Sequence, residues 1–167
     1  MIWLELLKID TRERPKDLIN IIKRVLGDDK VSIETLHAAD YAVSTWVGIE
    51  RKRTNNLVSS IVRDYTGGVK EIWGQLKKCM DMYGRVYLLV EGTLEATADP
   101  KWCKVEGRMR QVPYVAVQAS VDRAQDLGIH VMWTGDMQET ALMLKWLYYQ
   151  TTRSPHAIVM GGRTDGI

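Results

Sequence analysis

The sequence has little cysteine and no long apolar run. Two cysteines occur among 167 residues, without a CxxC spacing or a nearby histidine pair, which argues against zinc binding and a disulfide framework. We therefore expect Cys79 and Cys103 to be reduced and buried. No run approaches the roughly 18 apolar residues of a membrane helix, and the apolar start reaches Asp10 too early for a signal peptide. These absences predict an intracellular protein that does not associate with membranes.

The sequence also has almost no net charge. Its 23 Lys and Arg residues nearly balance 21 Asp and Glu residues, which leaves a formal charge of +2. Binding to a polyanion such as DNA would therefore depend on local patches rather than on the whole surface. The apolar content of 46% in 167 residues is ordinary for one globular domain with a real core.

Hydrophobic periodicity predicts that strands and helices alternate along the chain. Residues 93–111 are polar and irregular, and we expect a surface loop or a short helix there. The alternation predicts an α/β fold in which helices flank a central mixed β-sheet. The expected strands are residues 3–9, 31–36, 41–51 (a single strand, or a hairpin bent near residues 44–45), 85–92 and 129–134; the expected helices are 15–27, 54–65, 69–84, 113–127 and 136–150.

An acid and an amine stand two residues apart in the stretch ERK, residues 50–52. On a strand, Glu50 and Lys52 project from the same face, whereas Arg51 points the other way. A carboxylate can hold a divalent cation, and an ammonium group can stabilise charge on a phosphate or on an attacking water. Asp40 offers a second carboxylate from a neighbouring strand or turn. The pattern therefore indicates metal-assisted hydrolysis of a phosphodiester.

Several short motifs, taken in order, resemble the nuclease domain of the XPF family of structure-specific DNA endonucleases, including its archaeal Hef relatives. They are IDTRE (9–13), DY (40–41), ERK (50–52), SSI (59–61), Gln75 and VYLLVEG (86–92), and the resemblance covers about residues 5–150. It implies a restriction-endonuclease-like core in residues 1–152. It also implies cleavage of one DNA strand near a branch, flap or fork, with Mg²⁺ or Mn²⁺, leaving 5′-phosphate and 3′-hydroxyl ends, in repair, recombination or replication.

The resemblance also implies a catalytic set. Asp40 and Glu50 match the metal ligands, together with the backbone carbonyl of Arg51, which makes Arg51 part of the set. Lys52 matches the group that orients or activates water. Asp10, in the family's first acidic motif, is the last member that we expect to act in catalysis.

Further matching positions imply an edge to this site. Arg12 and Glu13 belong to the same first acidic motif as Asp10, and Gln75 lies where the family has a glutamine near the site. Three basic residues, Arg12, Lys52 and Arg53, are expected to contact DNA.

The chain departs from the family pattern at two positions. Ala39 stands where the family has glycine before the aspartate, which matters only if the turn needs glycine's backbone freedom. Asn56 stands where the family signature has aspartate, and this removes a charge at the site's edge. The change is compatible with a tolerated variant, an introduced inactivating substitution, or a natural loss of catalysis. A pseudonuclease that binds branched DNA or a catalytic partner is therefore the alternative function, and no residue excludes an RNA substrate.

The C-terminal third raises two further expectations. The aromatic and leucine residues of segment 133–149 are apolar on too many sides for one core, and the resemblance favours a homodimer formed through the C-terminal helices. Residues 153–167 are expected to form a flexible or docked tail, too short for the helix-hairpin-helix domain that family members usually carry. We therefore expect either a minimal nuclease or a piece of a longer protein.

Overall fold

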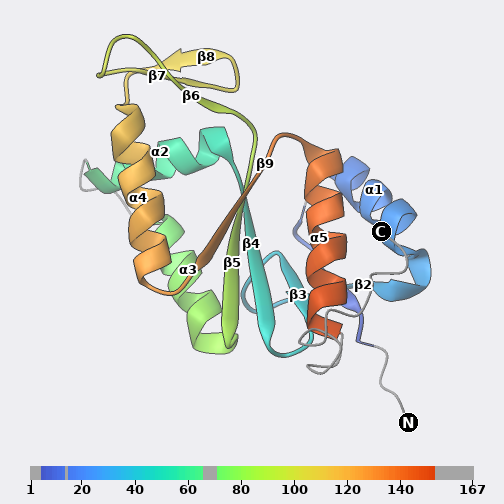
Figure 1. Cartoon of the computed structure of the whole chain (residues 1–167). Coiled ribbons are helices and arrows are strands. Elements are labelled where there is room, and N and C mark those ends of the chain that lie inside the picture. Colours follow the sequence, from blue (N-terminus) through green and yellow to red (C-terminus); the bar gives the residue numbers. More distant parts are fainter. Residues whose placement is uncertain (1–4, 14, 66–70, 153–167) are drawn as a thin grey trace, which may run out of the picture.

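The computed structural model describes residues 5–13, 15–65 and 71–152. The expected strand start at residues 3–4, a glycine pair at 67–68 and the tail at 153–167 lie outside the described residues. The elements, shown in Figure 1, are β1 (Leu7–Asp10), α1 (Lys16–Leu26), a 3₁₀ turn (Asp28–Lys30), β2 (Val31–Glu34), β3 (Tyr41–Val43), β4 (Val47–Arg53), α2 (Thr54–Tyr65), α3 (Glu71–Met82), β5 (Arg85–Glu91), β6 (Leu94–Ala96), β7 (Cys103–Val105), β8 (Arg108–Arg110), α4 (Tyr114–Asp126), β9 (His130–Thr134) and α5 (Met137–Thr152).

Six strands form a mixed sheet in the order β2-β1-β3-β4-β5-β9. Strands β3 and β4 form an antiparallel hairpin, whereas β4, β5 and β9 run parallel to one another. Helices α1 and α5 lie on one side of the sheet, and α2, α3 and α4 lie on the other (Figure 1). The predicted mixed sheet flanked by helices is therefore confirmed.

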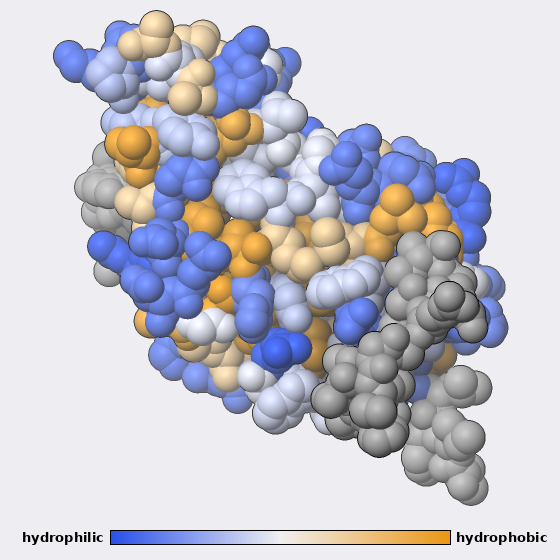
Figure 2. Space-filling model, viewed as in Figure 1, coloured by the Kyte–Doolittle hydropathy of each residue, from blue (hydrophilic) through white to orange (hydrophobic). Residues whose placement is uncertain are grey.

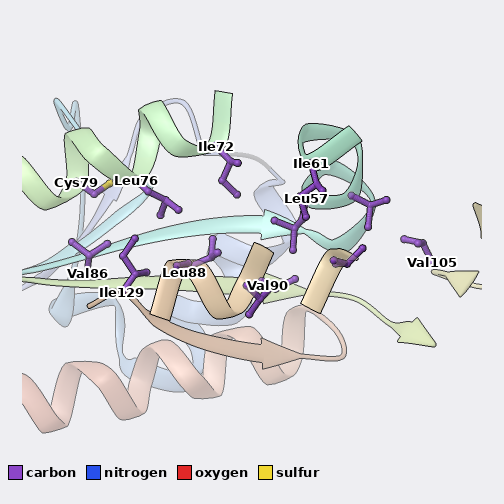
Figure 3. Packing of buried hydrophobic residues seen from close by; sticks show 14 of the residues in the cluster. Leu57, Ile61, Ile72, Leu76, Cys79, Val86, Leu88, Val90, Val105 and Ile129 are labelled. Carbon is purple, nitrogen blue, oxygen red and sulfur yellow. The ribbon is translucent and has the colours of Figure 1, made fainter. Parts of the chain in front are cut away.

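Strand β5 is buried on both faces, which explains its uninterrupted run of apolar residues. Val86, Leu88 and Val90 point to the side of α2, α3 and α4, and Figure 3 shows them facing side chains from those helices. Leu89 belongs to the second core cluster, with residues of α1 and α5. Position along β5 therefore decides which of the two cores a side chain joins.

The prediction of a loop or short helix for residues 93–111 is wrong. This segment forms a separate three-stranded antiparallel sheet, β6-β7-β8, which we name the β6–β8 sheet. Glu106 and Gly107, with φ of 47° and 78°, are both left-handed, as a two-residue hairpin turn requires. Glutamate rarely adopts this conformation, so the turn is hard to recognise from sequence. The sheet stands beyond the carboxyl ends of β4 and β5 (Figure 1).

Two smaller expectations are settled by the structure. Cys79 and Cys103 are both buried and unpaired, as expected. The second strand is shorter than predicted, because it ends at Glu34 and the chain then turns towards β3.

None of the described helices is long and apolar enough to cross a membrane.

Candidate metal and catalytic centre

Asp40 and Glu50 meet at the open end of the β3–β4 hairpin. The last ladder pair there is Tyr41 opposite Ile49, so the next residues along, Asp40 and Glu50, are cross-strand neighbours. The Asp40 backbone N–H donates to the Ile49 carbonyl at 3.0 Å. Asp40 Oδ2 accepts a hydrogen bond from the backbone N–H of Arg51 at 2.8 Å. The hairpin therefore places the two residues side by side and holds the Asp40 carboxylate with a backbone hydrogen bond.

Both carboxylates are hard to ionise in this environment. Burial, and then the charge of Asp40, raise the pKa of Glu50 to about 8. Burial likewise raises the pKa of Asp40, against the opposing effect of its hydrogen bond from Arg51. Two neighbouring buried carboxylates destabilise each other's charge, and a cation between them would relieve that cost.

Lys52 supplies a positive charge on the same face of β4. Its Nζ lies 3.7 Å from Glu50 Oε1, and its side chain is 17% exposed. At this distance the two groups form an ion pair but not a close hydrogen bond. The ammonium group therefore stays available to a ligand that approaches from solvent.

The donor set fits Mg²⁺ or Mn²⁺ bound in part by the protein. Among the described residues no group of three or more His, Cys, Asp or Glu side chains is arranged to hold a metal. The protein oxygens are therefore the two carboxylates and the Arg51 carbonyl. In a strand the N–H and C=O of one residue point the same way, so the Arg51 carbonyl faces the Asp40 side, beyond the end of β3. Mg²⁺ commonly takes one or two carboxylates and keeps waters or substrate oxygens as its other ligands.

The Arg51 side chain points to the opposite face, towards α1 and α5. It donates from Nη1 to Glu13 Oε1 at 2.9 Å, and from Nε and Nη2 to the two Glu91 carboxylate oxygens at 3.0 and 2.7 Å. Thr140 Oγ1 donates to Glu91 Oε2 at 2.7 Å. We name these four residues the Arg51 cluster. The Arg51 cluster holds the face of β4 that is turned towards α1 and α5, whereas Glu50 and Lys52 project from the opposite face.

Glu13 has an unusual environment within this cluster. Burial, and then the charge of Asp40, raise the pKa of Glu13 to about 7, although Arg51 and the Tyr41 hydroxyl both bind its carboxylate. Asp40 therefore interacts electrostatically with acids on both faces of β4.

Asp10 and Arg12 form a closed pair at the edge of the site. Both oxygens of Asp10 accept from the Arg12 guanidinium, at 2.7 and 3.0 Å, and Oδ2 also accepts from the Leu36 N–H at 2.7 Å. The hydrogen bond from the Arg12 side chain is the main reason that the pKa of Asp10 falls to about 2. Asp10 also donates its backbone N–H to the Asp40 carbonyl at 2.9 Å, so the pair supports the Asp40 turn.

Tyr83, directly after α3, and Cys79, within α3, support the Asp40 turn and Glu50. Tyr83 Oη donates to the Ala38 carbonyl at 3.1 Å, and the Cys79 sulfur lies 4.0 Å from Glu50 Oε2. The Tyr83 ring packs so closely on Gly48 that an added Cβ would lie 2.3 Å from it, which requires glycine there. Ala39, in this turn, has a left-handed φ of 72°, which costs an L-residue roughly 1 kcal/mol. The turn does use the backbone freedom of the family's glycine, and α3 holds it in place without one.

The remaining predicted residues lie around this centre. Gln75 is exposed on α3, one helical turn before Cys79, and Asn56 is exposed in the first turn of α2. Neither side chain hydrogen-bonds to another residue in the described part of the chain. Arg53 is exposed and forms an ion pair with Glu106 at 2.9 Å. The site roles of all the predicted residues remain predictions.

Sequence reasoning missed four residues of the centre. Cys79 and Tyr83 occupy apolar positions of an amphipathic helix, where nothing distinguishes a supporting contact from core packing. Thr140 gives no signal either, because its partner lies 49 residues away. Glu91 does have a signal: a single acid that ends a fully apolar strand must find a buried partner.

Comparisons with known proteins give matches to a family model and to two curated proteins. A family model described as "ERCC4 domain" matches residues 9–147. The chain is 29% identical over 160 residues to the Fanconi anemia group M protein of Gallus gallus, covering 95% of the chain and 7% of that protein. It is 27% identical over 136 residues to the 3'-flap repair endonuclease Xpf of Saccharolobus solfataricus, covering 81% of the chain and 51% of that protein. The chain therefore spans about half the second relative and a small part of the first.

Two solved structures have the same fold. XPF from Aeropyrum pernix matches with a TM-score of 0.67 and 22% identity, over 93% of this chain and 69% of that one. The same protein in complex with DNA matches with a TM-score of 0.66 and 21% identity, over 98% of this chain and 76% of that one. The expected restriction-endonuclease-like α/β core is confirmed by this likeness.

Proposed function

The chain belongs to the ERCC4 domain family, and from this premise we propose that it is a metal-dependent endonuclease that hydrolyses phosphodiester bonds in branched, flap or fork DNA. The observation that carries the proposal is the meeting of two carboxylates, the buried Glu50 and the partly buried Asp40, beside the ammonium group of Lys52. Such a set can hold a divalent cation at one end and a phosphate at the other. A DNA substrate would place the protein inside the cell.

Each residue has a separate task in the proposed reaction. Mg²⁺ or Mn²⁺, when bound, supplies Lewis-acid stabilisation of negative charge. Asp40, Glu50 and the Arg51 carbonyl would hold that ion. Lys52 donates a hydrogen bond to a phosphate oxygen or to the attacking water, which it orients for in-line attack. The backbone and α3 contacts keep these groups in place, so little reorganisation is needed when substrate binds.

The similarities to known proteins support DNA as the substrate. One relative is named a 3'-flap repair endonuclease, and one similar structure was solved in complex with DNA. These names state what the two similar proteins do or bind. For this chain, branched DNA is the substrate class that we propose.

A pseudonuclease is the second candidate, and Asn56 is the observation that favours it. An aspartate at this position would add a negative charge to the first turn of α2, which contains no acidic residue. However, Asn56 is exposed and makes no side-chain hydrogen bond to Lys52 or to any other described residue. Loss of a charge at such a position is expected to perturb the site less than loss of a buried one. We therefore favour an active enzyme.

A cleavage assay tests the proposal and separates the two candidates. The chain as written and Asn56→Asp are incubated with Mn²⁺ and labelled flap, fork and linear duplex DNA. We expect both to cut flap or fork DNA, at rates within about tenfold, because Asn56 lies at the surface. If only the Asn56→Asp variant cuts DNA, the asparagine at position 56 is the cause of lost activity in the chain as written. If both proteins bind DNA but neither cuts it, the pseudonuclease is the correct function. If the chain instead cuts RNA of the same shape preferentially, RNA is the substrate rather than DNA.

We also propose that the chain forms a homodimer through the outer face of β9 and α5. Trp133, Leu142 and Trp146 are exposed there by 38%, 49% and 41%, and they line a hollow of about 500 Å³. Figure 2 shows apolar side chains gathered over β9 and between α4 and α5. Clusters of exposed apolar side chains on one face usually mark an interaction site.

Trp146→Glu tests the dimer. A charge at the centre of an apolar interface is expected to convert a dimer into a monomer, measured by light scattering at micromolar concentrations. Met82→Glu is the matched control, because Met82 is 49% exposed on α3, on the other side of the sheet. A monomeric chain as written, or a dimer that withstands Trp146→Glu, would contradict this proposal.

A further inference from the structure

The β6–β8 sheet is an unusually long connection placed beside the candidate site. Residues 92–113 join β5 to α4, whereas most connections between a strand and a helix take about 2–6 residues. The connection leaves the carboxyl end of β5, whose neighbour β4 carries Glu50 and Lys52. Connecting segments positioned by a rigid scaffold often carry binding residues. This one stands beyond the carboxyl end of β4, and its Arg110 contacts α2, the helix that follows β4.

The β6–β8 sheet is fixed to the rest of the domain. Cys103 and Val105 are fully buried in the core that contains residues of α2, and Figure 3 shows Val105 at the end of that core. Glu106, in the turn between β7 and β8, forms an ion pair with Arg53 at 2.9 Å, next to Lys52 in sequence. Its N–H also donates to the Thr93 carbonyl at 3.0 Å. Side chains on this sheet are therefore held at a set position relative to the centre.

Strand β8 carries two arginines that form no ion pair with any acid among the described residues. Arg108 and Arg110 lie on one face of β8, because they are two residues apart. Arg110 donates to the Asn55 side-chain oxygen and, at 3.2 Å, to Ser59 Oγ, both of which are neutral. Arg108 is exposed, and its side chain forms no hydrogen bond or ion pair within the described part of the chain. β8 is also an edge strand of its sheet.

We propose that Arg108 and Arg110 bind the sugar–phosphate backbone of the DNA duplex beside the cleavage site, so that the β6–β8 sheet orients the substrate. The inference rests on the proposed function. Guanidinium groups suit phosphate because they donate two parallel hydrogen bonds, and exposed ones keep their full charge for a polyanion. DNA is favoured over an acidic protein surface because the proposed function already makes DNA the ligand of this domain, and Arg110 contacts α2, the helix that directly follows the strand carrying Glu50 and Lys52.

Binding of labelled fork DNA, measured by fluorescence anisotropy in EDTA over a series of salt concentrations, tests the inference. We expect Arg108→Ala to weaken binding about fivefold at 0.1 M salt, and to reduce the slope of log affinity against log salt by about 1, as for one lost phosphate contact. Arg108→Glu should weaken binding further. Met109→Ala is the matched control, because this neighbour is 55% exposed and points to the other face of β8. It should bind within about twofold of the chain as written.

The outcomes separate this inference from the proposed function. If the chain as written binds and cuts fork DNA while all three variants match it in affinity and salt slope, the inference is overturned and the nuclease stands. If Met109→Ala and Arg108→Ala weaken binding equally, β8 acts through its fold rather than its charge, which also overturns it. If the chain as written neither binds nor cuts any DNA, the proposed function fails, and the inference fails with it.

Discussion

Lys52→Ala is expected to reduce cleavage of flap or fork DNA by about 10³-fold, the usual effect of removing one group that stabilises charge in the transition state. Lys52 is the positive charge nearest to Glu50, at 3.7 Å from its carboxylate. The variant should still fold, because the side chain is partly exposed and leaves no unpaired buried atom of its own. DNA affinity should fall by less than about tenfold, because one phosphate contact at most is lost. Single-turnover cleavage and anisotropy measure the two effects separately.

A second lysine provides the control for this variant. Lys77 lies on α3, is 76% exposed and pairs with Asp81 one turn away. Lys77→Ala has the same change of charge, so it should cut like the chain as written. Cleavage that survives Lys52→Ala, or that falls equally in both variants, would remove Lys52 from the catalytic set.

Arg51→Met is expected to lower the free energy of unfolding by about 3–5 kcal/mol, as is usual when one partner of a buried ion pair is removed. Glu13 and Glu91 would then be buried acids without their guanidinium partner. Methionine retains much of the side-chain volume, so the loss reports charge rather than packing. Since domains are stable by about 5–15 kcal/mol, this change removes a large share of the total. Urea unfolding measures it.

The loss should depend on pH with a defined sign. In the native chain Arg51 opposes the raised pKa of Glu13 and holds the pKa of Glu91 below its ordinary value. Without the arginine, the folded-state pKa of Glu13, already above its unfolded value, rises further, and that of Glu91 rises above its unfolded value. A carboxyl group whose pKa is higher in the folded than in the unfolded state lowers the free energy of unfolding as the pH increases from the unfolded-state pKa to the folded-state pKa. The stability difference between Arg51→Met and the native chain should therefore be largest near pH 8 and shrink towards pH 5, a window that contains the Glu13 pKa of about 7.

A triple variant supplies the control. Replacing Glu13 and Glu91 by glutamine together with Arg51→Met removes the unbalanced charges, so stability should partly recover and its pH dependence should flatten. An Arg51→Met protein as stable as the native chain at pH 8 would show that the cluster does not support β4. A loss that stays constant between pH 5 and 8 would assign it to packing.

Most of the fold can be predicted from sequence because its elements show clear periodicity. The continuous apolar run of β5 and the amphipathic pattern of α1 each have one physical explanation, a strand buried on both faces and a helix on a surface. The β6–β8 sheet cannot be predicted in the same way. Its strands are three residues long, and its turn depends on Glu106 in a conformation that glutamate seldom adopts. The stability of this sheet comes from burial of Cys103 and Val105 against distant helices.

The positions of Glu50 and Lys52 are easier to predict from sequence than the residues that hold them in place. Alternation along a strand places Glu50 and Lys52 on one face and sends Arg51 to the other, which requires only the strand prediction. The partners that hold these residues come from helices and strands far along the chain. Tyr83 reaches the Ala38 carbonyl across 45 residues, and no local pattern contains that information. Sequence therefore indicates which groups act, while the contacts that position them depend on tertiary packing.

The Arg51 cluster also bears on when the protein becomes competent during its synthesis. Its contacts join residues 38, 40 and 49 positions apart, and the last of them comes from α5. A ribosome that has completed only β4 and β5 has already made Asp40, Glu50 and Lys52, but Thr140 and the helix that covers this face do not yet exist. Strands that pair in parallel and over long separations also form late in folding. A nascent or truncated chain therefore carries the proposed catalytic groups without the contacts of the Arg51 cluster, and we expect the proposed DNA cleavage only from a chain that is complete through α5.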